Sequence, residues 1–169
     1  FEPGPPNVDS IELARVVDRA IRESKAIDLK KLCIVEGEKV WMALIDIYTI
    51  NNHGNLQDAS ALAALAALKQ ARIPGYDGKK VDYKIKNEKL PIVSLPIECS
   101  TAKIKDKLLS DPILDEEKMM DAKLTVGITE GGVICAMQKG GKGVLSIEDV
   151  DKIIEVSLKN SEKIRKLIK

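Results

Sequence analysis

SIELARVVDRAIRES, residues 10–24, is the stretch that decides how the N-terminal part of this 169-residue chain folds. Its apolar residues recur at intervals of three or four: Ile11, Ala14, Val17 and Ile21. Because that spacing places them on one side of a helix, the pattern predicts an amphipathic α-helix over 10–24. Asp9 and Glu12 have the spacing of a capping box at the start of this helix.

The same helix concentrates arginine in a chain whose other cations are mostly lysines. Arg15, Arg19 and Arg22 are separated by four and three residues, so they share one side of the helix. The planar guanidinium group can bind two phosphate oxygens at once, and the cluster therefore suits a polyanion. Glu12 and Asp18 are also spaced for surface ion pairs with these arginines, which is the simpler interpretation.

The segments that follow predict a mixture of strands and helices. Residues 32–35 and 40–50 are rich in β-branched and aromatic residues and flank a turn, which predicts a mostly buried hairpin. Asp46 lies inside the second of these runs and would need a partner if it were buried. The alanine-rich segment 57–71 predicts a smooth helix that packs closely against its neighbours in the middle of the molecule.

The C-terminal half repeats the order of strands followed by a helix. Strands are predicted at 97–104, 107–109, 122–129 and 133–138. Ser146 and Asp149 have capping-box spacing and begin an amphipathic helix that runs toward Lys169. The whole pattern predicts an α+β fold of mixed sheets packed with helices. The lysine-rich segment 75–89 separates the halves 1–74 and 90–169.

Composition excludes several classes of protein. The net charge is only +1, so any contact with nucleic acid must come from a local cluster. Aromatic residues make up 3% of the chain, which argues against stacking of bases and for contacts with phosphates. No apolar run approaches the length of a membrane span. Cys33, Cys99 and Cys135 are too far apart for a zinc motif, and we expect buried thiols in a reducing cytoplasm.

Two further segments suggest chemistry without specifying it. The densest set of carboxylates is Asp111, Asp115, Glu116, Glu117 and Asp121. Two of them could hold a divalent metal or act as acid and base, or the set could be a solvated loop and helix start. The glycine-rich loop 139–143 precedes a helix and could cradle a phosphate, but its spacing fits no phosphate-loop motif and favours a flexible connection.

Several motifs together resemble a known family. Residues 1–6, FEPGPP, followed by IELARVVDR at 11–19, resemble the archaeal exosome ring subunit of RNase PH type that lacks its own active site. The resemblance continues through 41–64, 111–123 and 138–143, and so covers nearly the whole chain. It implies an RNase PH-like fold of two β-α units, the first of them incomplete here because family members carry an additional N-terminal portion.

The resemblance also implies function and partners. Such a subunit alternates with a catalytic sister in a hexameric ring in the cytoplasm. The ring carries RNA-binding cap subunits and shortens single-stranded RNA from the 3′ end by phosphorolysis. The resemblance implies no cofactor, no metal and no membrane contact for this chain. An uncovered first unit exposes apolar surface, so we also expect this chain to self-associate.

A comparison with the family position by position implies two things: some residues contact RNA, and the active site is lost. The positions that correspond to active-site residues in catalytic relatives are Ala59, Ser60, Ala61, Asp111, Glu117 and Lys123. At Ala61 an arginine that anchors the attacking phosphate is replaced, and Lys123 inverts the charge of an aspartate. This implies that the subunit is not an enzyme. Arg15 and Arg19 match positions expected to contact RNA, with Arg22 as a lesser contact.

Two rival functions remain open from the sequence. Asp111 and Glu117 could serve a self-sufficient, metal-assisted phosphorolytic exoribonuclease. Alternatively, the chain could be an α/β interaction module with no role in RNA binding.

Overall fold

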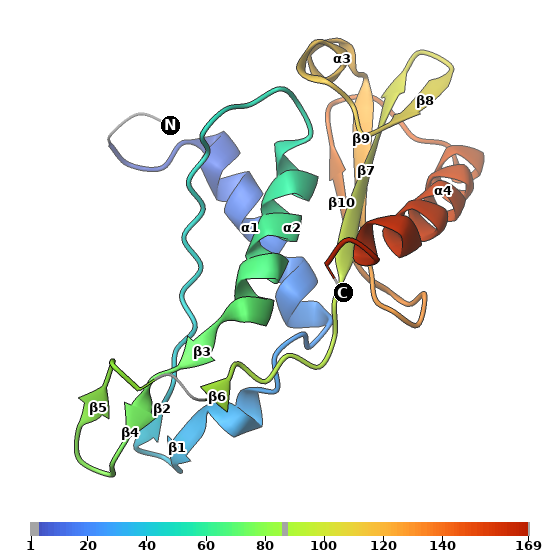
Figure 1. Cartoon of the computed structure of the whole chain (residues 1–169). Helices are drawn as coiled ribbons and strands as arrows, with labels where there is room; N and C mark the ends of the chain where they lie inside the picture. Colours follow the sequence, from blue (N-terminus) through green and yellow to red (C-terminus); the bar gives the residue numbers. More distant parts are fainter. Residues whose placement is uncertain (1–3, 86–87, 169) are drawn as a thin grey trace.

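The computed structural model describes residues 4–85 and 88–168. Its centre is one four-stranded antiparallel sheet with strand order β10-β9-β7-β8. The strands are β7 Ile97–Ile104, β8 Lys107–Ser110, β9 Ala122–Ile128 and β10 Ile134–Gly140. The helices are α1 Val8–Glu23, α2 Leu56–Gln70, α3 Leu114–Met119 and α4 Ile147–Arg165. The pair α1 and α2 covers one face of the sheet and α4 covers the other (Figure 1).

The alternation of side chains along β9 explains these three layers. Leu124, Val126 and Ile128 point to one face and pack against Ile153 of α4. Gly127 points to the opposite face, where its missing side chain lets Ala20 of α1 approach closely. A strand whose two faces are both covered must be nearly continuous in apolar or small residues, as β9 is.

The alanine-rich helix lies in the middle of the molecule, as the sequence predicted. Ala61, Ala64 and Leu68 of α2 are buried against Val17 and Ile21 of α1. Leu65, on another side of α2, is buried against β7. Because alanine adds little bulk, α2 can lie close to a helix and a sheet at once.

Small two-stranded pieces gather at one end of the molecule (Figure 1). A 3-10 helix spans Leu29–Leu32, and the strands are β1 Cys33–Val35, β2 Lys39–Val40, β3 Arg72–Ile73, β4 Gly75–Tyr76, β5 Val81–Asp82 and β6 Glu88–Lys89. Their pairs are β1 with β2, β3 with β6 and β4 with β5. The lysine-rich connection at 75–89 therefore carries local pairing of its own.

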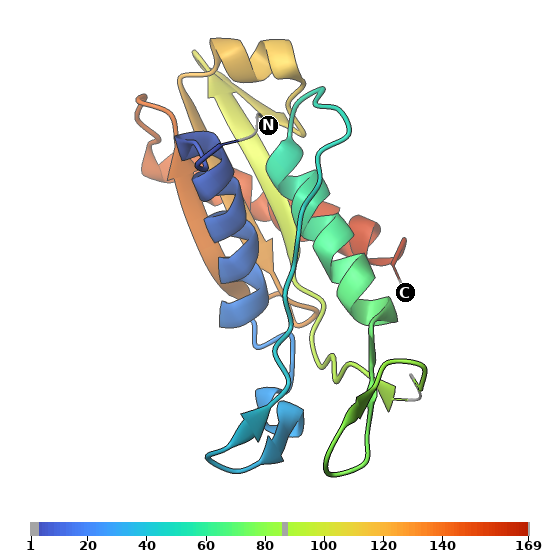
Figure 2. The same ribbon diagram turned by 90° about the vertical axis from the view of Figure 1, so that its left-hand side faces the viewer.

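The predicted buried hairpin at 40–50 is wrong in its second strand. Pairing with β1 ends at Val40, and 41–50 crosses α1 and α2 as an extended segment that joins no sheet of the described chain (Figure 2). Leu44 is 79% exposed and Ile50 is 98% exposed. Ile47 alone packs against the core between α1 and α2. Alternation turns Met42, Leu44, Tyr48 and Ile50 outward, where no described layer covers them. Asp46 is exposed and needs no buried partner.

Two smaller predictions also need correction. The first helix is capped by Asn7, whose Oδ1 accepts the N–H of Ser10 at 2.8 Å, and not by the Asp9–Glu12 box. Cys33 is exposed, whereas Cys99 is buried and Cys135 is half-buried. The Ser146–Asp149 capping box at the start of α4 is confirmed. None of the described helices is both long and apolar enough to cross a membrane.

Candidate functional site

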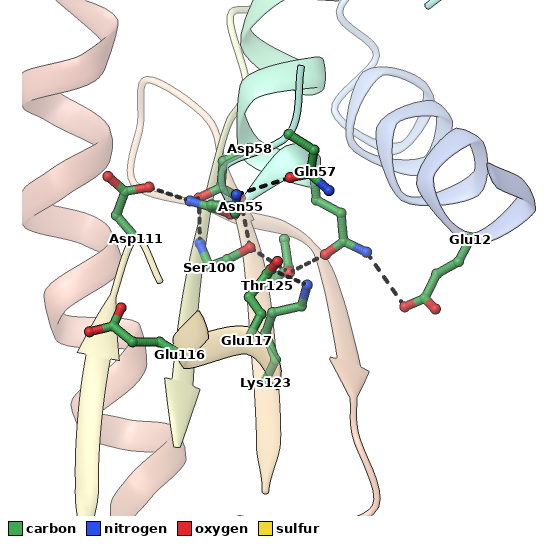
Figure 3. A network of polar contacts seen from close by, with 12 residues as sticks. Glu12, Asn55, Gln57, Asp58, Ser100, Asp111, Glu116, Glu117, Lys123 and Thr125 are labelled. Atoms are coloured by element: carbon green, nitrogen blue, oxygen red, sulfur yellow. Dashed lines mark hydrogen bonds and ion pairs between the residues drawn. The ribbon is translucent and has the colours of Figure 1, made fainter. Parts of the chain in front are cut away.

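A network of polar side chains joins the start of α2 to the central sheet (Figure 3). Asp58, in the first turn of α2, accepts the backbone N–H and the hydroxyl of Ser100 on β7, each at 2.7 Å. The Ser100 hydroxyl also lies 2.7 Å from the Thr125 hydroxyl on β9. Thr125 in turn donates to Gln57 at 3.2 Å, and Gln57 reaches Glu12 of α1 at 3.5 Å.

Asn55 links two carboxylates of this network. Its Nδ2 donates to Asp58 at 2.9 Å and to Asp111 at 2.7 Å. Asn55 has a left-handed backbone conformation, with φ of 47°, which turns the chain into α2. Both amide hydrogens therefore bridge two carboxylates, Asp58 and Asp111, which come from segments far apart in the sequence.

Negative charge dominates this site. Burial raises the pKa of Asp58 although Ser100, Asn55 and the charge of Lys123 all favour its ionised form. Lys123 is the cation whose charge acts on Asp58, and its Nζ pairs with Glu117 at 3.3 Å. Both side chains of that pair are less than one-fifth exposed. The positive charge is therefore already neutralised inside the protein.

A groove of about 410 Å³ opens beside this network, between α2 and α4. Its polar lining includes Asn55, Asp58, Asp111 and, from α4, Lys163. A phosphate in this groove would meet the carboxylates of Asp58 and Asp111 against one lysine, Lys163, so negative charge outweighs positive charge in the lining. The groove is therefore a poor anion site despite the nearby helix N-terminus.

The structure brings only some of the six family-matched positions together: Glu117 pairs with Lys123, and Ala59 and Asp111 line the groove. Ala59 lines the groove, but Ser60 and Ala61 are buried, and Ala61 faces the α1 core instead of Asp111. Ala61 offers no charge to an anion, and the loss of a phosphate-anchoring arginine at this position stays a prediction. Asp58 is the α2 residue that points toward Ser100 and Asp111.

Sequence reasoning missed Asn55, Gln57, Asp58 and Ser100. The signal for Asp58 was weak, because an acidic residue in a first helical turn is favourable for the helix itself. Ser100 gave no signal at all, since serine is common in strands and loops alike.

The rest of the acidic segment plays structural roles. Asp115 pairs with Lys118 at 3.3 Å on the surface, and Glu116 caps the short helix α3 by accepting the N–H of Ile113. Asp121 accepts the N–H of Lys105 in a turn. In the described part of the chain, the carboxylates, thiols and imidazole form no cluster of three or more suited to a metal ion.

The glycine-rich loop 139–143 is docked onto the protein. The N–H of Gly143 donates to the carbonyl oxygen of Asp121 at 2.6 Å. A Cβ added at Gly141 or Gly143 would lie 2.7 Å from that oxygen. The glycines thus allow the backbone of the loop to lie close to the backbone at Asp121. This explains why the loop is rich in glycine without invoking a bound phosphate.

The three arginines of α1 differ in their environment. Arg22 pairs with Asp18 at 3.3 Å and lies 3.6 Å from Glu23, so the ion-pair interpretation holds for it. Arg19 is half-buried and its Nη1 donates to Gln138 of β10 at 3.3 Å. Arg15 is exposed and pairs with no residue in the described ranges. Arg15 and Arg19 therefore keep their positive charge available to an outside anion.

Comparison with known proteins places the whole chain in one group. Models of the 3′ exoribonuclease family match it twice, domain 1 over residues 1–74 and domain 2 over residues 94–160. The exosome complex component Rrp42 of Methanothermobacter thermautotrophicus is 48% identical over 99% of this chain and 62% of that relative. The Rrp42 of Pyrococcus abyssi is 45% identical over 99% of this chain and 63% of its own length.

Solved structures agree with this grouping. A chain of the Archaeoglobus fulgidus exosome with RNA bound to the active site matches all of this chain and 65% of its own, with 43% identity and a TM-score of 0.90. A chain of an archaeal exosome core matches with 41% identity and a TM-score of 0.87, over 96% of this chain and 64% of its own. This chain thus spans a little under two thirds of the length of the relatives it matches.

Proposed function

Because the chain belongs to the 3′ exoribonuclease family of RNase PH-like proteins, we propose that it is a non-catalytic, RNA-positioning subunit of an exosome. In this proposal it alternates with a catalytic sister subunit in a hexameric ring that carries RNA-binding cap subunits. The ring shortens single-stranded RNA from the 3′ end, with inorganic phosphate as the nucleophile.

One observation carries the non-catalytic part of the proposal. Where α2 meets the sheet, the helix presents Asp58 beside Asp111, and the nearby Lys123 is already paired with Glu117. Phosphorolysis requires a seat for inorganic phosphate next to the negatively charged RNA backbone. A like charge at 4 Å costs about 1 kcal/mol in water and about 4 kcal/mol near a protein surface. The carboxylates therefore oppose the nucleophile that the reaction needs.

The arginines of α1 support the RNA-positioning part. Arg15 and Arg19 lie one helical turn apart, and neither forms an ion pair within the described chain. Contacts of arginine with phosphate hold RNA in register without reading its sequence. The low aromatic content of 3% fits a surface of this kind.

The experiment is a phosphorolysis assay of this subunit alone and in a ring. The purified subunit is incubated with single-stranded RNA, inorganic phosphate and magnesium, and the release of nucleoside diphosphates is measured. We expect none from the subunit alone and none from a ring whose sister subunits have lost their catalytic carboxylates. Phosphate-dependent release from either sample would favour the self-sufficient enzyme and overturn the proposal.

The RNA-binding part has its own comparison. A ring with intact sister subunits should bind RNA less tightly when Arg15 and Arg19 are both replaced by alanine. Binding and degradation that stay unchanged would instead favour an interaction module with no contact to RNA.

A further inference from the structure

Glu98 is a buried carboxylic acid for which the fold provides no partner. It lies in β7 and is only 4% exposed. Its Oε2 is buried without a hydrogen bond, and the side chain forms no ion pair with any described residue. A buried acid in this state is costly, so its retention in the middle of a sheet calls for a reason beyond packing.

A small cavity connects Glu98 with one of the arginines of α1. The cavity measures about 10 Å³ and is lined by Val16, Arg19, Glu98, Thr125 and residues 136–138 of β10. Arg19 is the cation in this lining. Its bond to Gln138, at 3.3 Å, is long for a hydrogen bond of a charged group. Arg19 and the unpartnered carboxyl group of Glu98 therefore border the same water-sized space.

We propose that Glu98 is a positioning residue that controls where the Arg19 guanidinium lies. With Glu98 neutral, Arg19 stays with Gln138 at the surface and can bind a phosphate of RNA. With Glu98 ionised, the carboxylate draws Arg19 inward and away from RNA. The assignment of RNA as the ligand rests on the proposed function above, whereas the coupling between the two side chains does not.

The charges around Glu98 place this change close to neutral pH. Burial, followed by the negative charge of Asp58, raises the pKa of Glu98 to about 8. Ionisable groups on three described elements lie around it: Arg19 of α1 lines the same cavity, the charge of Asp58 of α2 acts on Glu98, and Cys135 of β10 has a thiol pKa that is itself raised, chiefly by burial. Asp58 disfavours ionisation of Glu98, and Arg19, in its position beside Gln138, does not contribute to this shift. Arg19 therefore stabilises the ionised form only when it moves inward.

Arg15 provides a natural control within the same helix. It is exposed and does not line the cavity, so its contact with RNA should not depend on Glu98. RNA affinity should therefore fall on going from about pH 7 to about pH 9 through Arg19 alone. One lost charge-assisted contact corresponds to roughly a ten- to hundred-fold loss of affinity.

The test measures the position of the Arg19 side chain and the affinity for RNA in separate experiments. The 15N resonance of the Arg19 side chain is followed in the 169-residue chain between about pH 6 and pH 10. Binding of a fluorescent oligoadenylate by the assembled ring is measured at both ends of this range. The wild type should show a pH-dependent shift of Arg19 and the loss of affinity. Glu98→Gln should show neither, and Arg15→Ala should bind more weakly but keep the pH dependence.

Gln138→Ala gives a second, independent reading. Without its surface acceptor, Arg19 should move toward Glu98 at lower pH, so the midpoint of its shift should fall. The coupling would be overturned if the pH-dependent shift of the Arg19 resonance were the same in Glu98→Gln as in the wild type. It would also be overturned if the midpoint of that shift did not move in Gln138→Ala. If Arg19 follows Glu98 but neither arginine affects RNA binding, the coupling stands and the proposed function fails.

Discussion

Asp58 and Ser100 join the central helix to the central sheet, because the aspartate accepts both the backbone N–H and the hydroxyl of the serine at 2.7 Å. The pair fixes the start of α2 over the middle of β7. It also consumes both oxygens of the carboxylate inside the protein. Asp58 lines the groove but uses its carboxylate to hold α2 on the sheet. This agrees with the proposal that the subunit positions RNA without cleaving it.

Replacing Asp58 should destabilise the fold. Asp58→Ala leaves the N–H and hydroxyl of Ser100 without an acceptor, and we expect a loss of about 2–4 kcal/mol in the free energy of unfolding. Asp58→Asn keeps one acceptor oxygen and should cost less. Urea unfolding followed by circular dichroism measures both. The exposed Asp115→Ala should stay within about 0.5 kcal/mol of the wild type, and equal losses at both sites would contradict the structural role.

Glu98 should make stability depend on pH in a defined direction. Its pKa is about 8 in the fold against an ordinary value of 4.5, so the unfolded chain releases this proton first as pH rises. The folded state is therefore penalised progressively from about pH 4.5 to about pH 8, by up to about 3 kcal/mol at pH 7.

Glu98→Gln removes this penalty. Its advantage in unfolding free energy over the wild type should grow between about pH 4.5 and pH 8 and be level on either side. Thermal and urea unfolding across that range measure it. A difference between the two proteins that does not change with pH would contradict the raised pKa.

The arginines of α1 should act through charge. In the assembled ring, replacing Arg15 or Arg19 by alanine should weaken RNA binding and reduce the slope of log affinity against log salt by about one unit each. Filter binding or anisotropy at several salt concentrations measures the slope. Arg22→Ala should have a smaller effect, because Asp18 and Glu23 already neutralise that guanidinium. Equal effects at all three positions would argue for a diffuse field instead of specific contacts.

The extended segment 41–50 should make this chain self-associate. Its outward side chains Met42, Leu44, Tyr48 and Ile50 are between 77% and 98% exposed. An unpaired edge with apolar side chains is a template for a further strand. We expect concentration-dependent assembly by light scattering, which Leu44→Lys should reduce. Val144→Lys, at a site that is 81% exposed elsewhere on the surface, should leave assembly unchanged. A strictly monomeric wild type would refute this expectation.

The amino-acid sequence by itself determined the helices and most of the sheet. The spacing of Val17 and Ile21 was enough to predict an amphipathic helix, and the alanines of 57–71 were enough to predict a close-packed central helix, because period and bulk are local properties. That these two helices pack against each other came from the structure. The Ser146 capping box and the strands β7, β8, β9 and β10 followed from equally local patterns. The same reasoning failed at 40–50, where a strand-like pattern found no neighbouring strand in the described chain.

Only the tertiary structure decided which polar residues meet. Asp58, Ser100 and Asp111 come from different elements, and no periodicity links their positions. Ala61 looked like the decisive site position, yet the rotation of α2 turns it into the core and turns Asp58 toward the sheet. The partnerless burial of Glu98 was equally invisible. Whether a charge is paired, buried or free depends on what packs against it, and that is a property of contacts between segments far apart in the chain.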